Sequence, residues 1–170
     1  NFKERYYLAG TMRADASSLV NPLYRWGYFP SVSAGWIISD EQFFSSLSKT
    51  FSYLKLRASW GKSGGNLPGS VGAYQSYVAP VTYIDANGNV INGYVPSSIN
   101  NPELKWEIQQ DYTLALDAAL FNNKLNVTFE NYVRNPKNLL LSVNVHYTLG
   151  YPQGYTATQL VNIGRLTTKG

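Results

Sequence analysis

The chain has 170 residues, with 14 Lys and Arg against 10 Asp and Glu, so its formal net charge is +4. Charged residues make up 14% and aromatic residues 15% of the sequence, which contains 14 tyrosines, 14 glycines and no cysteine. This composition excludes a disulfide scaffold and a cysteine nucleophile, is too rich in apolar residues for intrinsic disorder, and gives no sign of a nucleic-acid partner because the positive charge is small and scattered.

No apolar run approaches the ~20 residues of a membrane-spanning helix. Residues 1–5 are mostly polar and do not read as a secretory signal. Abundant tyrosine, low charge and missing cysteine are typical of outer-membrane barrels and also of many β-sandwiches. The choice between these two fold classes therefore depends on the pattern along the chain.

Alternation of apolar and polar residues with period two predicts strands at 5–15, 29–38, 54–62, 104–119, 125–141 and from about 161. The run 104–119 is roughly three times as long as an ordinary strand of ~5–6 residues, whereas a tilted membrane-crossing strand needs ~9–11. Its apolar face begins with Leu104 and Trp106. With Trp36 and Trp60, Trp106 places aromatic residues near strand ends, as in the girdles of membrane barrels.

Short and long connections alternate clearly in the second half of the chain and only weakly in the first; bacterial barrels alternate short periplasmic turns with long outer loops. Residues 121–124 form a predicted tight turn with left-handed Asn. Within the link 39–53, we expect Ser39 to cap one helical turn that runs through Phe44. The predicted outer loops are 16–28, 63–103 and 142–160.

The longest loop has a single charged residue, Asp85, between 63 and 102. Its middle predicts a small hairpin around Asn87 and Gly88; a calcium loop is disfavoured by Val90 and Pro96 at its sixth and twelfth positions. The loop tyrosines either contact substrate or a lid, by stacking on a sugar or gripping a peptide, or pack the loop against itself. These candidates are Tyr74, Tyr77, Tyr83 and Tyr94.

The polar strand faces carry charges of both signs, which we interpret as the lining of a wet lumen whose ion pairs bridge neighbouring strands. The candidate lumen-lining residues are Arg13, Asp15, Lys55, Arg57, Lys105, Glu107, Asp111 and Asp117. Carboxylate pairs for glycoside hydrolysis can be picked from this set, but no motif supports an enzyme. The single histidine, His146, lacks partners for an imidazole metal site. We expect no catalytic, cofactor or metal site.

Five segments in order resemble signatures of the SusC/RagA family of TonB-linked outer-membrane proteins. They are Tyr7-Leu8 with Arg13–Ser18, Arg25–Ser31 with Gly35–Glu41, Leu54–Gly61 with Gly64 and Asn66, Leu104–Glu107, and Asn162–Gly164 with Lys169-Gly170. The one departure is Ala16, which stands where the family often has Gly.

The resemblance implies an all-β fold, an antiparallel segment of about six long strands from a plugged transmembrane barrel of about 22 strands. The plug domain and the remaining strands would lie outside residues 1–170. The whole protein would be a TonB-energised importer of oligosaccharides or peptides, and not an enzyme. It would sit in outer-membrane lipid of a Gram-negative, Bacteroidetes-like cell with a SusD-like surface lipoprotein as partner. The alternative is a soluble β-sandwich that binds carbohydrate through its loop tyrosines.

Overall fold

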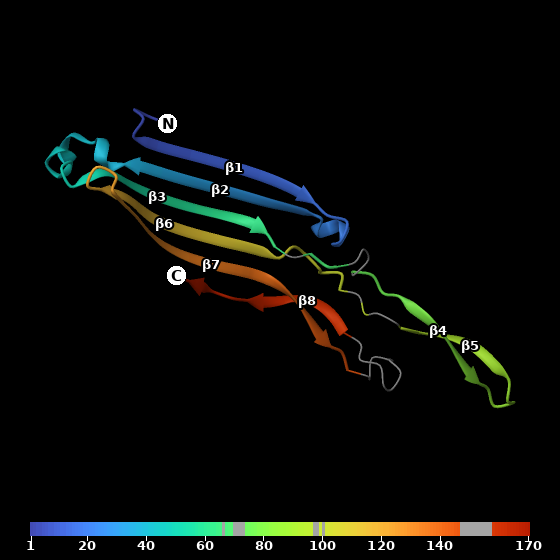
Figure 1. Cartoon of the computed structure of the whole chain (residues 1–170). Helices are drawn as coiled ribbons and strands as arrows, with labels where there is room; N and C mark the ends of the chain where they lie inside the picture. The colour runs from blue at the N-terminus through green and yellow to red at the C-terminus, as the bar shows by residue number, and fades with distance from the viewer. Residues whose placement is uncertain (66, 70–73, 97–98, 100, 147–157) are drawn as a thin grey trace.

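The computed structural model describes residues 1–170 except 66, 70–73, 97–98, 100 and 147–157. Long antiparallel strands form one twisted sheet (Figure 1). Its strands, in spatial order, are β1 (Tyr6–Ala16), β2 (Trp26–Ile37), β3 (Phe51–Gly64), β6 (Ile108–Leu120), β7 (Leu125–Asn144) and β8 (Thr158–Arg165), with the short β9 (Thr168–Lys169) also paired to β7. A second sheet, the hairpin of β4 (Val78–Ile84) and β5 (Val90–Pro96), projects beyond one end of the main sheet.

Every predicted strand is present, and most extend beyond their alternating core because pairing with a neighbour continues past it. β2 begins at Trp26 and β3 runs from Phe51 to Gly64. The exception is the run 104–119, in which pairing with β3 and β7 starts only at Ile108.

The prediction that Leu104 and Trp106 share the apolar face of a strand is wrong. Leu104 is fully buried. The Trp106 ring packs edge-on against Phe29, which lies on the polar face of β2, with centroids 5.5 Å apart. Its indole Nε1 donates to the backbone oxygen of Arg25 at 2.9 Å. Residues 104–107 therefore leave the plane of the sheet because their partners lie across its polar side.

The β2–β3 and β6–β7 connections define one end of the sheet, called the turn end. Phe121, Asn122 and Asn123 have φ of 53°, 56° and 64°, which confirms the left-handed tight turn before β7. The β2–β3 connection contains two 3-10 helices, η2 (Ile38–Asp40) and η3 (Gln42–Leu47). The prediction that Ser39 caps a helical turn is wrong, because Ser39 lies inside η2. The residue before η3 is Glu41, and its side chain makes no capping hydrogen bond.

The β1–β2, β3–β6 and β7–β8 connections define the opposite end, called the loop end. The β1–β2 connection holds a third 3-10 helix, η1 (Pro22–Tyr24), capped by the Asn21 side chain, which accepts from the Leu23 N–H at 2.9 Å. The hairpin predicted around Asn87 and Gly88 is confirmed as β4–β5, with Gly88 at φ 84°. Most of the predicted loop 142–160 lies outside the described residues.

The register keeps apolar residues together, because directly paired residues share a face. Trp36 pairs with Leu56, Leu56 with Leu116, and Leu116 with Phe129 across four strands. Large side chains on this apolar face remain exposed, including Leu8 at 77% and Phe129 at 67%. In the described part of the chain the only other sheet is the β4–β5 hairpin, so the buried two-sheet core of a sandwich is not formed.

No helix within the described residues is long and apolar enough to cross a membrane.

Candidate functional site: the polar wall and the loop end

The opposite face of the main sheet is polar and is called the wall. Strand alternation places most of the predicted lumen-lining residues on it. These are Arg13, Asp15, Lys55, Arg57, Asp111 and Asp117. Lys105 and Glu107 were also predicted for this lining, but they precede β6 and belong to a different structural unit at the loop end.

Arg57 and Asp117 form the strongest ion pair of the wall. The Arg57 Nε lies 2.6 Å from Asp117 Oδ2, and Nη2 lies 3.0 Å from Oδ1. The Thr128 hydroxyl donates to the same carboxylate at 3.1 Å. A bidentate guanidinium–carboxylate contact fixes both position and orientation, so this group links β3, β6 and β7 on their polar side.

The other ion pairs of the wall differ in what they connect. Arg134 and Asp111 approach to 3.9 Å across β7 and β6, so this pair bridges strands as predicted. Arg13 and Asp15 are 2.8 Å apart but lie on the same strand. The prediction that the wall charges bridge neighbouring strands is therefore confirmed for two pairs and wrong for this third one.

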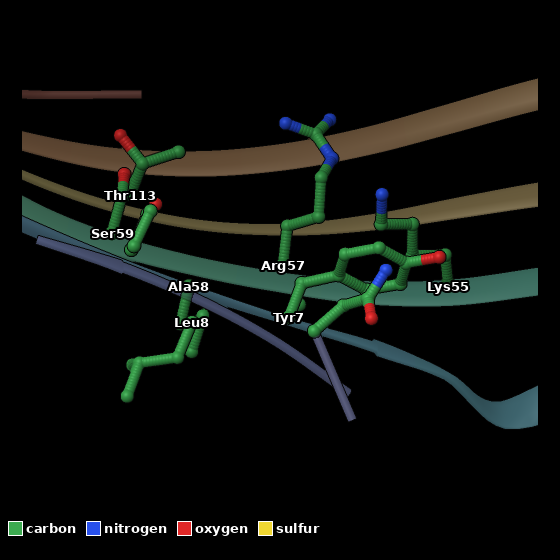
Figure 2. A pocket seen from close by; sticks show the side chains of 12 residues that line it. Tyr7, Leu8, Lys55, Arg57, Ala58, Ser59 and Thr113 are labelled. Atoms are coloured by element: carbon green, nitrogen blue, oxygen red, sulfur yellow. The ribbon is translucent and has the colours of Figure 1, made fainter. Parts of the chain in front are cut away.

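A hollow of about 450 Å³ opens on the wall beside Tyr7, Lys55 and Arg57. Figure 2 shows these three side chains rising on one side of the sheet, while Leu8 and Ala58 point to the other. Gly35 lies on its floor, where a Cβ would come within 3.3 Å of Lys55 Cε. The Lys55 ammonium lies 5.1 Å from the centre of the Tyr7 ring, a cation–π contact.

The hollow combines an aromatic face, two cations and the hydroxyls of Ser59 and Thr113. An arrangement of this kind suits a polar ligand with a ring, a hydroxyl or a carboxylate. The tyrosines predicted to contact substrate all lie in the long loop, and Tyr7 was not among them. Tyr7 has the same alternation phase as Arg13 and Asp15 on the polar side of the first strand, and that phase could have identified it.

Residues 101–107, called the strap, connect distant parts of the loop end. The Asn162 side chain accepts from the Lys105 N–H at 3.0 Å and donates to the backbone oxygens of Lys105 and Asn138, both at 2.9 Å. The Asn101 amide donates to the Leu160 oxygen, and Asn21 to the Pro102 oxygen, both at 2.9 Å. The strap thus ties the β1–β2 connection to β8.

Part of the small buried core of the protein lies under the strap. Phe29 is 4% and Glu107 8% exposed. Gly64 leaves room for the aromatic pair, since a Cβ there would come within 2.9 Å of the Phe29 ring and 3.1 Å of Trp106. The backbone oxygen of Glu107 accepts a hydrogen bond from the Gly65 N–H at 2.8 Å. Glu107 is therefore packed against the backbone instead of standing on the wall.

The loop tyrosines do not form one stacking platform. Tyr83 pairs with Ile91 and Tyr94 with Pro80, which places them on opposite faces of the β4–β5 hairpin. They are 53% and 73% exposed. Tyr77 donates its hydroxyl to Gln75 at 3.0 Å before the hairpin starts, and Tyr74 is half-buried. The exposed rings of Tyr83 and Tyr94 remain available to a partner.

At the turn end, the aromatic residues of the apolar face converge on Glu41. Its carboxylate accepts from the Tyr6 hydroxyl at 2.5 Å and from the Trp36 Nε1 at 3.2 Å. Arg5 contributes an ion pair at 3.2 Å. These contacts, the Tyr6 hydrogen bond first, lower the pKa of Glu41 below its ordinary value. Aromatic rings with their polar tips held in this way are typical of a membrane interface.

The family model described as TonB dependent receptor-like, beta-barrel matches residues 1–170. The chain belongs to this family. The resemblance to SusC and RagA is confirmed, and the sheet is a segment of a large transmembrane β-barrel with long outer loops.

Sequence and structure similarity to individual proteins supports the same family. The chain is 33% identical to the TonB-dependent receptor SusC of Bacteroides thetaiotaomicron, over 98% of this chain and 16% of SusC. It is 32% identical to a TonB-dependent receptor of Formosa agariphila, over 99% of this chain and 16% of that protein. The solved RagAB peptide importer in its closed-closed state is 28% identical with a TM-score of 0.82, over 99% of this chain and 17% of that one. The chain thus spans about one-sixth of the length of its relatives.

Proposed function

We propose that this chain forms part of the barrel of an outer-membrane active transporter that imports oligosaccharides or peptides. The observation that carries the proposal is the two-sided sheet. One face is apolar, with exposed large side chains on β1, β2, β6 and β7 and half-buried ones on β3, while the other holds ion pairs and a hollow. In the proposed orientation the wall lines the lumen and the loop end faces the cell exterior, because outer loops are the long ones in such barrels.

The whole transporter would contain further strands and a plug domain beyond residues 1–170, and TonB would supply energy through that plug. Family membership and the likeness to SusC and RagAB support this organisation. The same likeness supports a location in the outer membrane of a Bacteroidetes-like bacterium. The chain itself would perform no chemistry and need no cofactor.

A SusD-like surface lipoprotein is the proposed partner at the loop end. The β4–β5 hairpin favours such a contact because it extends beyond the sheet (Figure 1). One of its faces exposes Ile84 at 72%, Val90 at 71% and Tyr94 at 73%. Exposed apolar residues gathered on one face are typical of a protein interaction surface.

For the cargo, both an oligosaccharide and a peptide are compatible with the wall. The Tyr7 ring offers a stacking surface for a sugar, and Lys55 offers charge to a peptide carboxylate, since Arg57 is already paired with Asp117. RagAB is described as a peptide importer, which supports the peptide reading, whereas the likeness to SusC leaves the glycan reading open.

Uptake in cells tests the proposal. The full-length protein would be deleted and restored in its host, and entry of fluorescent oligosaccharide and peptide pools would be measured with and without TonB. We expect uptake of one pool to require both the protein and TonB. Uptake that persists without TonB, or release of a cleaved product by the purified protein, would refute the proposal.

A further inference from the structure

On β3 and β6, a polar row follows the last aromatic row of the apolar face at the loop end. Trp60 and Tyr112 are directly paired on this face, and the next row outward pairs Lys62 with Gln110. The Lys62 ammonium lies 6.0 Å from the Trp60 ring centre, and the Gln110 amide donates to the Tyr112 hydroxyl at 2.6 Å. Aromatic residues followed by polar ones mark the level at which a barrel surface passes from hydrocarbon to headgroups.

The following row places two cations directly opposite each other. Ile108 pairs with Lys137 on β7, and Lys137 pairs with Arg165 on β8. Both cations are exposed. Like charges in this position are destabilising. The ion pairs within the described residues use Arg5, Arg13, Arg57 and Arg134 instead, so no described carboxylate compensates this pair or Lys62.

We propose that Lys62, Lys137 and Arg165 form a cation cluster that binds the phosphate groups of phosphorylated lipid headgroups in the outer leaflet. The inference rests on the proposed membrane orientation. Charge complementarity carries it, since the cluster has three cations on the lipid-facing side and the adjacent Trp60 and Tyr112 set its depth. Long basic side chains place their stems on the apolar surface and their charges in the headgroup layer.

The test uses the full-length transporter purified in a neutral detergent. Bisphosphorylated lipid A is added as the probe, with dephosphorylated lipid A as the matched lipid, and bound lipid is measured by native mass spectrometry. Replacing Lys62, Lys137 or Arg165 by Gln is expected to weaken binding of the phosphorylated lipid about fivefold for each cation removed. Binding of the dephosphorylated lipid should be unchanged.

Arg134→Gln is the control, because Arg134 lies on β7 close to Lys137 but faces the wall. Lys137→Arg should retain binding, which separates charge loss from misfolding. Equal loss in the Arg134 variant, or undiminished binding in the triple Gln variant, would overturn the proposal. TonB-dependent uptake is recorded for the same variants: normal uptake with lost lipid binding supports the cluster, and failure of uptake in the unmodified protein bears only on the transport proposal.

Discussion

The paired strands β3 and β6, called the β3–β6 ladder, and the strap have the same sequence pattern but different structures. Both alternate apolar and polar residues, and Leu104 and Trp106 are in phase with Leu114 and Leu116. In the ladder, backbone pairing with two neighbours keeps that phase and leaves the apolar side exposed. In the strap, Asn162 and Arg25 take the backbone and side-chain hydrogen bonds, and the apolar residues turn inward. Alternation therefore reports which residues share a side only where a neighbouring strand is present.

The largest expected effect breaks the ladder's apolar face. Leu56 and Leu116 are directly paired there, and a charge on the lipid side of a barrel is strongly unfavourable near mid-membrane. Leu56→Asp with Leu116→Asp should abolish outer-membrane assembly of the full-length protein, measured by membrane fractionation and heat-modifiable mobility. Ser59→Asp, on the polar side of the same strand, should assemble normally. Assembly of the double variant would show that this face does not meet lipid.

A smaller effect is expected at the strap. Asn162→Ala removes one acceptor and two donor contacts to backbone groups, and unsatisfied partly buried groups cost about 1–3 kcal/mol. Hydrogen exchange of residues 101–107 should become faster while exchange of β6 stays slow. Asn126→Ala, an exposed position of β7, serves as control. If both segments are destabilised together, the strap is not a separate unit.

The wall pair should contribute less. The side chains of Arg57 and Asp117 are 41% and 25% exposed, so solvent screens their attraction. A double-mutant cycle with Arg57→Gln and Asp117→Asn, read by thermal unfolding of the full-length protein, should give a coupling of about 0.5–1 kcal/mol. The cycle with Arg134 and Asp111, at 3.9 Å, should give a smaller one. The reverse order would contradict the geometry of the wall.

The smallest effect concerns Glu41 and its pH dependence. Its pKa is lowered in the folded protein from an ordinary value of 4.5. The contribution of the ionised Glu41 carboxylate to the stability of the protein is therefore complete above that ordinary value. It is lost as the pH falls through the lower pKa that Glu41 has in the folded protein. The difference in melting temperature between wild type and Glu41→Gln should shrink over this interval. A difference for Glu41→Gln that does not change with pH would exclude the ionised carboxylate as the hub of Tyr6 and Trp36.

The contacts at the loop end show why the sequence predicted some site residues and misplaced others. Arg57 and Asp117 follow from phase, because both lie inside paired strands. Lys105 and Glu107 have the same phase but no strand partner on either side. Tyr7 was overlooked since its role depends on Gly35 and Lys55 of neighbouring strands. The segments Leu104–Glu107 and Asn162–Gly164, each a short resemblance in the sequence, contact one another through Asn162 and Lys105.

The sequence by itself determined which residues share each face of the sheet, the tight turn at 121–124 and the β4–β5 hairpin. These features depend on local chemistry, namely the period of a strand and the left-handed conformations of Asn and Gly. Only the tertiary structure decided where β6 begins, which charges pair on the wall, and that the strap packs Trp106 against Phe29. Those outcomes depend on residues far apart in the chain, such as Arg25 and Asn162, whose hydrogen bonds to the strap replace those of a strand neighbour.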